Sequence, residues 1–209
     1  MHKNSTELKI VRQFKKVSAL TVCDEAFTTW NQKSWKKRAI EIGCGAGLHP
    51  IQFASQNPET ALVALERTKI KFNSFSQRTK SHSLENIYPV NKDALFWLPG
   101  NISANTIDEY FLLYPNPYPK EEQANKRWHR SSLMHFIIES LKPLGKINIA
   151  SNEAWYMDEC KNYFENYWKL KLISNVDLSQ EADFNPRTHF ERKYLKRNLI
   201  CRNMIFQKQ

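Results

Sequence analysis

Apolar residues recur along this chain in short runs that alternate with longer stretches of mixed polarity. Runs such as residues 61–65 (ALVAL) and 110–113 (YFLL) are continuously apolar, as expected for strands covered on both faces. The strand-like segments are residues 38–43, 60–66, 87–92, 107–114, 145–151, 170–177 and 199–207. Helix-like stretches lie at residues 48–56, 68–81, 129–141 and 154–168. Strands that alternate with helices of about 10–15 residues indicate βαβ units and a mainly parallel sheet.

The end of the chain breaks this alternation. A polar loop at residues 179–198, rather than a helix, separates the last two strand-like segments, which predicts an antiparallel pair at one sheet edge. Residues 1–36 are interpreted as a basic, partly helical N-terminal arm, and residues 37–209 as one domain. Because open α/β sheets bind ligands at the carboxyl ends of their strands, we expect the functional site there.

Composition narrows the class of protein. The chain is 41% hydrophobic and 12% aromatic, which is typical of a packed globular protein. No apolar run approaches the roughly 20 residues that span a bilayer, and the basic N-terminus lacks the apolar core of a secretory signal. We therefore expect a cytoplasmic protein without membrane association. The four cysteines form no CxxC pair and the histidines are scattered, so neither a metal site nor a disulfide framework is predicted.

The chain is strongly basic, with a formal net charge of +10. An excess of this size favours a polyanionic partner, and nucleic acid is the commonest, although some basic proteins have no such partner. Basic residues gather in four clusters, which are Lys9, Arg12, Lys15 and Lys16; Lys33, Lys36, Lys37 and Arg38; Lys120, Lys126, Arg127 and Arg130; and Arg187, Arg192, Lys193, Lys196 and Arg197. Clusters that are distant in sequence can converge on one face of a fold.

A glycine-rich loop follows the first predicted strand. Three of the five glycines, Gly43, Gly45 and Gly47, lie in residues 41–47 (EIGCGAG). Glycine allows positive φ and close approach of the backbone to a ligand, so the loop suits a nucleotide-like cofactor. Dinucleotide-binding folds use a similar loop, but here Leu48 stands where their fingerprint would have its third glycine.

Carboxylates close the first three predicted strands at Glu41, Glu66 and Asp93. An acidic residue about 20 positions past the loop can hold a ribose diol. S-adenosylmethionine carries a positive sulfonium and a positive amine, so a carboxylate-lined pocket suits it electrostatically. We therefore predict S-adenosylmethionine as the cofactor, held by the glycine loop and the strand ends at Glu41, Gly43, Gly45, Glu66, Asp93 and Ala94.

Residues 114–120 (YPNPYPK) follow the fourth predicted strand. Three alternating prolines cannot continue a helix or a central strand, so they predict a stiff, extended turn at the carboxyl end of that strand. A methyl acceptor would be placed there. The alternative is that the segment is only a rigid connector.

With these motifs the sequence resembles the bacterial tRNA (guanine-N(7)-)-methyltransferase family over most of the chain from Arg38 onward. The matching segments are EIGCGAG (41–47), LE (65–66), YPNPYPK (114–120), where the family has F-P-D-P-W-x-K, and THFE (188–191), where it has T-x-[YF]-E. The resemblance implies a Rossmann-like class I methyltransferase fold, with a mostly parallel seven-stranded α/β sheet and an antiparallel edge pair. It also implies tRNA processing through RNA binding. The cofactor contacts that it implies are Glu41, Glu66, Asp93 and Asn116, and the acceptor contacts are Lys120, Ser151, Thr188 and Glu191.

The sequence departs from the family pattern in the acceptor half. Asn116 replaces the aspartate at the catalytic position, residues 121–127 (EEQANKR) replace the basic stretch R-H-x-K-R-R, and residues 150–152 (ASN) replace T-D-N. Methylation at N7 of guanine needs no proton removal, so the enzyme must mainly hold the reacting atoms in line. A nearby carboxylate would stabilise the cationic product, and Asn116 supplies no negative charge. We expect slower guanine methylation or a different acceptor.

Two other interpretations stay open. Asn-Pro followed by an aromatic residue partly matches the N-P-P-[YF] loop of amino-methyltransferases, which favours a small heterocycle or an exocyclic amine as acceptor. The weaker basic stretch would impair tRNA docking more than small-molecule binding. The third interpretation is a catalytically silent RNA-binding homologue. Four aromatic residues could either stack on a base or lie in the core, namely Trp97, Tyr114, Tyr118 and Trp155. Three basic residues could either contact phosphate or be solvated at a helix entrance, namely Lys126, Arg127 and Arg130.

Overall fold

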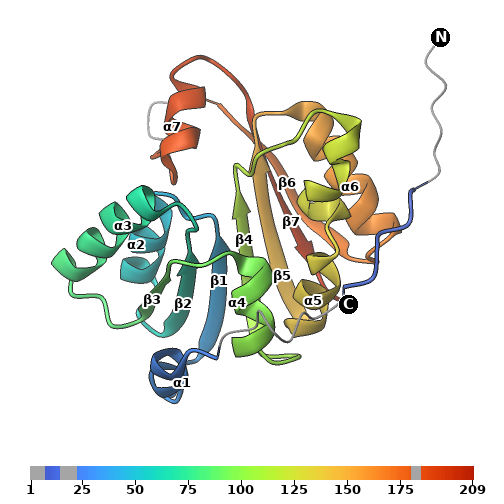
Figure 1. The fold of residues 1–209 in the computed structure, drawn as a ribbon. Coiled ribbons are helices and arrows are strands. Elements are labelled where there is room, and N and C mark those ends of the chain that lie inside the picture. The colour runs from blue at the N-terminus through green and yellow to red at the C-terminus, as the bar shows by residue number, and fades with distance from the viewer. Residues whose placement is uncertain (1–7, 15–22, 180–184) are drawn as a thin grey trace, which may run out of the picture.

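The computed structural model describes residues 8–14, 23–179 and 185–209. Within them seven strands form one sheet in the order β3-β2-β1-β4-β5-β7-β6 (Figure 1). The strands from β1 to β5 pair in parallel, and β7 pairs antiparallel with both β5 and β6. The strand bounds are β1 Lys37–Ile42, β2 Thr60–Leu65, β3 Ile87–Val90, β4 Ile107–Leu113, β5 Leu141–Ser151, β6 Lys171–Leu178 and β7 Cys201–Gln207. The predicted α/β class and the antiparallel edge pair are confirmed.

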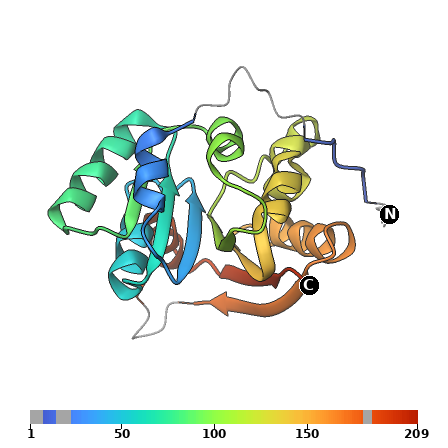
Figure 2. The same ribbon diagram turned by 90° about the horizontal axis from the view of Figure 1, so that it is seen from below.

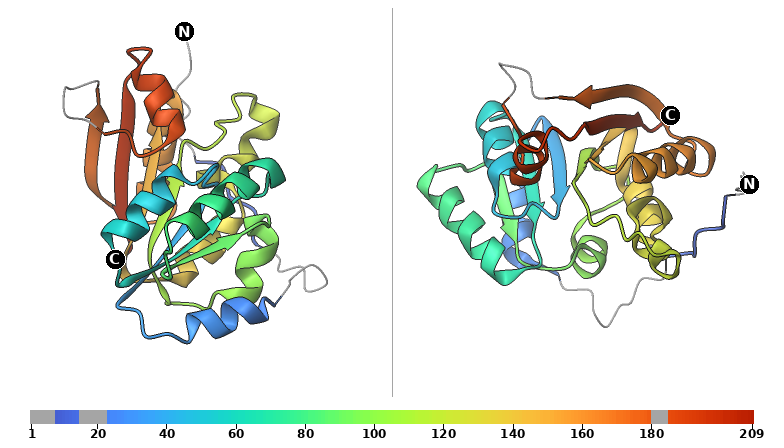
Figure 3. Two further views of the ribbon diagram at one scale, coloured as in Figure 1. Left: turned by 90° about the vertical axis from the view of Figure 1, so that its left-hand side faces the viewer. Right: turned by 90° about the horizontal axis from the view of Figure 1, so that it is seen from above.

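Helices cover the sheet on both faces, as Figures 2 and 3 show from below, from the side and from above. One face packs against α1, α4, α5 and α6, and the other against α2, α3 and the end of α7. The helix bounds are α1 Glu25–Asn31, α2 Leu48–Gln56, α3 Lys69–Ser81, α4 Ala94–Asn101, α5 Leu133–Ser140, α6 Ala154–Asn166 and α7 His189–Leu195, with short 3₁₀ helices η2 Glu121–Lys126 and η3 Trp128–Arg130.

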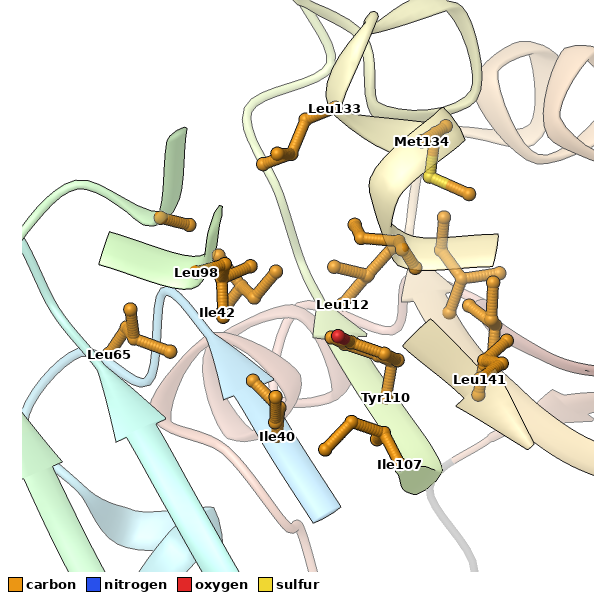
Figure 4. Close-up of a cluster of buried hydrophobic side chains, with 14 of the residues drawn as sticks. Ile40, Ile42, Leu65, Leu98, Ile107, Tyr110, Leu112, Leu133, Met134 and Leu141 are labelled. Atoms are coloured by element: carbon orange, nitrogen blue, oxygen red, sulfur yellow. The ribbon is translucent and has the colours of Figure 1, made fainter. Parts of the chain in front are cut away.

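The central strands β1 and β4 are buried on both faces because their side chains alternate between two apolar clusters. Ile40 and Tyr110 belong to the cluster under α4 and α5, whereas Ala39 and Phe111 belong to the cluster under α2. Figure 4 shows the first cluster, in which Ile42 of β1 lies next to Leu98 of α4, and Tyr110 and Leu112 of β4 lie nearer to α5. This double burial explains the continuous apolar runs of the sequence.

Two helices form where none was predicted. The first, α4, contains Pro99 and Gly100, which obscure any helical pattern, and the burial of its Trp97 and Leu98 compensates. Its N-cap is Asp93, whose Oδ1 accepts a hydrogen bond from the backbone N–H of Leu95 at 3.0 Å. Strand β3 ends at Val90, so Asp93 caps a helix rather than closing the strand, which corrects the prediction.

The second unpredicted helix, α7, lies inside the segment that was predicted to be a polar loop. Thr188 is its N-cap, and the Thr188 hydroxyl accepts a hydrogen bond from the backbone N–H of Glu191 at 3.0 Å. Seven residues are too few to show a clear period in the sequence. The helix predicted at 129–141 is also divided, because η3 ends at Arg130, α5 begins at Leu133, and β5 already begins at Leu141.

Near residue 10, the N-terminal arm contacts the end of α6. The backbone N–H groups of Lys9 and Val11 donate to the hydroxyls of Tyr163 and Tyr167, at 3.2 and 3.1 Å. Lys15 and Lys16 of the first basic cluster lie outside the described residues, and the boundary at residue 36 stays a prediction. Among the helices of the described ranges, none combines the length and the apolar character needed to cross a bilayer.

Candidate cofactor and acceptor site

A cavity of about 570 Å³ opens at the carboxyl ends of β1, β2 and β4. This is the volume of a typical small-molecule site, at the edge of the sheet where the strand topology predicts one. Five of the predicted site residues line it, namely Gly43, Glu66, Asp93, Ala94 and Asn116. In Figure 1, α7 lies beyond the same end of the sheet, and its Phe190 and Tyr194 complete one wall of the cavity.

The glycine loop has the backbone that its sequence predicts. Gly43, Gly45 and Gly47 have φ values of 83°, 60° and 85°. A Cβ atom at Gly43 or Gly45 would meet nothing within 4 Å, so the backbone there faces open space. At Gly47 a Cβ would lie 2.2 Å from Cδ2 of Phe75 in α3. The loop therefore leaves its first two glycines free to approach a ligand, while the third allows α2 and α3 to pack.

Glu66 follows the last residue of β2 and is 6% exposed at the cavity. Its carboxylate accepts hydrogen bonds from the backbone N–H of Gly45 at 3.0 Å and of Thr68 at 2.6 Å. Each carboxylate oxygen can accept further bonds, so a diol can still bind to it. Asp93 adds a second carboxylate to the cavity lining, and its Oδ2 lies 3.5 Å from Nη1 of Arg67.

Glu41 lies behind the glycine loop rather than in the cavity wall. Its carboxylate is 2% exposed and 2.7 Å from Nδ1 of His49 in α2. The His49 ring in turn packs edge-on against Phe111 of β4, with ring centroids 4.8 Å apart. His49 is therefore the buried partner of Glu41.

Residues 114–120 form the stiff turn that the prolines predict. Tyr114 and Tyr118 have φ values of 52° and 46°, which non-glycine residues adopt only at a cost of about 1–3 kcal/mol. The carboxamide oxygen of Asn116 accepts a hydrogen bond from the backbone N–H of Tyr118 at 3.1 Å and so closes the turn. Strained residues at the mouth of a cavity indicate a functional loop rather than a simple connector.

Arg127 anchors this loop through hydrogen bonds to its backbone carbonyl oxygens. It is 5% exposed, and its guanidinium donates to the carbonyl oxygens of Tyr118 at 3.1 Å and of Pro119 and Lys120 at 3.4 Å. The same guanidinium binds both carboxylate oxygens of Glu159 in α6, at 3.0 and 2.8 Å. Arg127 is therefore neither solvated at a helix entrance nor free to contact phosphate, because it is buried against the loop and Glu159.

The anchor depends on an ionised Glu159. Burial opposes its ionisation, but its contacts with His129 and Arg127 outweigh burial and lower the pKa of Glu159 to about 2. Burial itself lowers the pKa of His129. Arg130 also pairs with Glu159, at 3.2 Å. Arg127 therefore holds the loop to α6, and Arg130 pairs with Glu121 and Glu159 beside it.

The predicted acceptor residues do not gather in the cavity. Glu191 is fully buried and accepts hydrogen bonds from the Tyr114 hydroxyl at 2.8 Å and from Arg187 at 2.7 Å. Burial opposes the ionisation of Glu191, but its bonds with Arg187 dominate and lower its pKa. Burial and the nearby Glu191 raise the pKa of Tyr114. Thr188 caps α7, so this motif sets the position of that helix.

Ser151 and Lys120 also lie outside the cavity wall. The Ser151 hydroxyl is buried and accepts a hydrogen bond from the backbone N–H of Glu153 at 3.1 Å, at the start of α6. Lys120 is exposed on the outer side of the proline loop. Of the aromatic candidates, Tyr114 and Tyr118 line the cavity, whereas Trp97 is buried in the core and Trp155 packs on Arg127.

Several cavity residues were not predicted. Cations line it at Arg67, Lys71, Lys92 and Lys126, of which only Lys126 was a candidate. Lys71 lies over the ring of Phe190, with Nζ 5.8 Å from the centroid, and Lys126 lies over Tyr118 at 5.7 Å. Phe190 falls inside the THFE motif, and its aromatic ring next to a helix cap was the available signal. Nowhere in the described ranges do three or more His, Cys, Asp or Glu side chains gather as a metal site.

Comparison with known proteins places this geometry in a family. A family model described as "Putative methyltransferase" matches residues 36–201. A protein of Nitrosomonas eutropha named tRNA (guanine-N(7)-)-methyltransferase is 26% identical over 171 residues, which cover 82% of this chain and 76% of that protein. A protein of the same name from Chlorobium phaeobacteroides is 27% identical over 189 residues, which cover 85% and 88% of the two chains.

Solved structures share the fold at low sequence identity. The 16S rRNA methyltransferase KamB superposes with a TM-score of 0.67 at 17% identity, over 95% of this chain and 99% of that chain. A SAM-dependent methyltransferase from Aquifex aeolicus superposes with a TM-score of 0.57 at 12% identity, over 92% and 94% of the two chains. The match to residues 36–201 covers most of the sequence, and the chain therefore belongs to this family of methyltransferases.

Proposed function

We propose that this methyltransferase transfers the methyl group of S-adenosylmethionine to N7 of a guanine in tRNA. The observation that carries the proposal is that one cavity joins the glycine loop and Glu66 to the proline loop that carries Asn116. A cofactor and an acceptor can therefore meet in one space. The relatives named tRNA (guanine-N(7)-)-methyltransferase support this choice of acceptor.

The residues present suit S-adenosylmethionine. The open backbone at Gly43 and Gly45 allows the close approach that a nucleoside cofactor needs. Glu66 would accept the ribose hydroxyls, and Asp93 and Ala94 lie beside it along the cavity wall. Glu41, held by His49, adds negative charge behind the loop for the cationic end of the molecule. When bound, the cofactor supplies an electrophilic methyl group.

Methyl transfer to N7 of guanine requires little acid–base chemistry from the protein. N7 of guanine already presents a lone pair, so no general base is required, and rate depends on alignment and on exclusion of water. The proline loop, locked to α6 through Arg127, gives a rigid wall for the acceptor. With Asn116 in place of a carboxylate, no fixed negative charge on this loop offsets the positive charge of the product.

The charge of the cavity favours an acceptor that carries phosphates. Four cations line it at Arg67, Lys71, Lys92 and Lys126, against the two carboxylates Glu66 and Asp93. Lys71 and Lys126 also lie over aromatic rings, a combination of ring and cation that suits a base attached to a phosphate backbone. A neutral small heterocycle would gain less from these cations than an acceptor that carries phosphates.

The test is transfer of labelled methyl from S-adenosylmethionine to unmodified tRNA transcripts, with the product nucleoside identified by mass spectrometry. We expect 7-methylguanosine. The variant Asn116→Asp is assayed in parallel, because it places a carboxylate where the sequence has a carboxamide. Binding of S-adenosylmethionine is measured separately by calorimetry.

The other outcomes separate the alternatives. Tight cofactor binding without transfer to tRNA by either form would reject this proposal and favour a small heterocycle or an exocyclic amine. Salt-dependent RNA binding without any cofactor binding would reject it in favour of a catalytically silent RNA-binding protein.

A further inference from the structure

We propose that Asn116 is a specificity-determining hydrogen-bond donor that reads the O6 carbonyl of the guanine whose N7 is methylated. This inference rests on the proposed function and goes further, because it says which group of the base the protein recognises. It follows from the direction in which the Asn116 carboxamide is turned.

The orientation of that carboxamide is set by the turn itself. Its Oδ1 accepts the backbone N–H of Tyr118 at 3.1 Å. A backbone N–H can only donate, so the atom facing it must be the oxygen and not the nitrogen. The two N–H hydrogens on Nδ2 point elsewhere and have no hydrogen-bond partner among the described residues. Asn116 is exposed and lines the cavity, so this end of the amide is available to a ligand.

The rest of the loop offers few other donors. Pro115, Pro117 and Pro119 have no backbone N–H. The backbone N–H of Tyr114 is bound to the carbonyl oxygen of Ala150 at 2.8 Å, and that of Tyr118 is bound to Asn116. Within residues 114–119, the donors that remain are the carboxamide and backbone N–H of Asn116 and the Tyr118 hydroxyl. Asn116 is thus the main donor of the acceptor loop.

A donor at this point distinguishes the two purines. Guanine presents N7 and O6 side by side, and both are acceptors, whereas adenine presents N7 beside an amino group that is a donor. N7 must keep its lone pair free for methylation, so the adjacent O6 is the atom that a donor can hold. Next to adenine the same amide would face another donor.

The same orientation argues against an exocyclic amine as acceptor. An amine that is to be methylated needs oxygens that accept its hydrogens, and the carboxamide oxygen of Asn116 already accepts the N–H of Tyr118, which leaves it one lone pair, whereas both N–H hydrogens of its Nδ2 have no partner in the described part of the chain. The amide therefore favours a carbonyl next to a ring nitrogen.

The substitution Asn116→Asp tests the donor without changing the turn. One carboxylate oxygen can still accept the N–H of Tyr118, while the other replaces the N–H₂ group by an acceptor of nearly the same size. Asn125→Asp is the matched control, because Asn125 is exposed on η2 nearby and does not line the cavity, and the change in charge is the same.

The experiment uses the full chain and tRNAs ligated from two pieces, with guanosine, inosine or 2,6-diaminopurine riboside at the methylated position. All three bases keep N7, and only diaminopurine replaces O6 by an amino group. For the unsubstituted protein and for Asn125→Asp, we expect inosine to react like guanosine and diaminopurine to react at least about tenfold more slowly in kcat/KM. In Asn116→Asp this preference should disappear.

Each other result overturns a defined claim. If guanosine and diaminopurine react equally well with the unsubstituted protein, or if the methyl group is found on the amino group, the reading of O6 is wrong although the enzyme methylates RNA. If Asn116→Asp keeps the full preference, Asn116 does not read the base. If guanosine-containing tRNA accepts no methyl group although the cofactor binds, the proposed function is wrong, and the inference about Asn116, which depends on it, is wrong as well.

Discussion

Replacement of Arg127 by alanine is expected to loosen the acceptor loop and to destabilise the whole domain. The substitution removes the bidentate pair with Glu159 and the bonds to the carbonyl oxygens of Tyr118, Pro119 and Lys120. Loss of one partner from a buried ion pair typically costs about 3–5 kcal/mol. Glu159 keeps His129 and Arg130 as partners, so we expect a loss near the lower end, about 3 kcal/mol.

The assay is urea unfolding followed by circular dichroism, together with turnover on tRNA. A domain of this kind has about 5–15 kcal/mol of stability, so the variant should stay folded while its unfolding midpoint falls. Because the loop carbonyls lose their anchor, kcat should fall more than the affinity for S-adenosylmethionine changes. Lys33→Ala serves as the control, since the Lys33–Glu85 pair is exposed and should contribute no more than about 1 kcal/mol.

Two results would refute this reasoning. A loss below about 1 kcal/mol in Arg127→Ala would mean that the pair behaves like a surface ion pair despite its burial. An unchanged kcat would mean that the loop keeps its shape without the anchor. In a double-mutant cycle with Glu159→Gln, the coupling energy should exceed about 1 kcal/mol, and a value near zero would assign the effect to the carbonyl bonds alone.

Three further predictions concern stability and cofactor binding. The pKa of Glu159 in the folded protein is about 2, below its ordinary value of 4.5. Its contribution to the free energy of unfolding is therefore complete above pH 4.5 and is lost as the pH falls toward 2. The free energy of unfolding, measured across this pH range, should decline in the unsubstituted protein and decline less in Glu159→Gln. Gly47→Ala should cost several kcal/mol in urea unfolding, since its Cβ would lie 2.2 Å from Phe75, whereas Gly45→Ala, with φ of 60° and open space, should cost only about 1–2 kcal/mol. Glu66→Gln should weaken S-adenosylmethionine binding in calorimetry by about tenfold and leave RNA binding unchanged, and equal affinities would remove Glu66 from the cofactor site.

The fold could be predicted from local pattern because the strands are buried on both faces. Short apolar runs such as residues 61–65 and 110–113 are typical of central parallel strands, and the observed β2 and β4 contain them. The backbone conformation of the glycine loop could also be predicted, because glycine readily adopts the positive φ that Gly43, Gly45 and Gly47 have. The short helices α4 and α7 were not, because tertiary burial rather than periodicity stabilises them.

The cofactor half of the site was predictable where a residue acts by its position at a strand end. Glu66 lies at the cavity because it directly follows β2, and Asp93 and Ala94 because they begin the helix after β3. Glu41 shows the limit of this argument. Its place in β1 was clear, but the direction of its side chain depends on His49, which only the packing of α2 brings within 2.7 Å.

The acceptor half was decided by contacts between segments that are distant in sequence. The sequence alone determined a methyltransferase-type α/β sheet, its glycine loop and a stiff proline loop, since these depend on residue type and on burial along one segment. Only the tertiary structure turned Arg127 inward onto Glu159, buried Glu191 against Tyr114 and Arg187, and placed Phe190 and Lys71 at the cavity. The physical reason is that a charged side chain is exposed or buried according to the partners that the fold supplies, and sequence spacing does not reveal those partners.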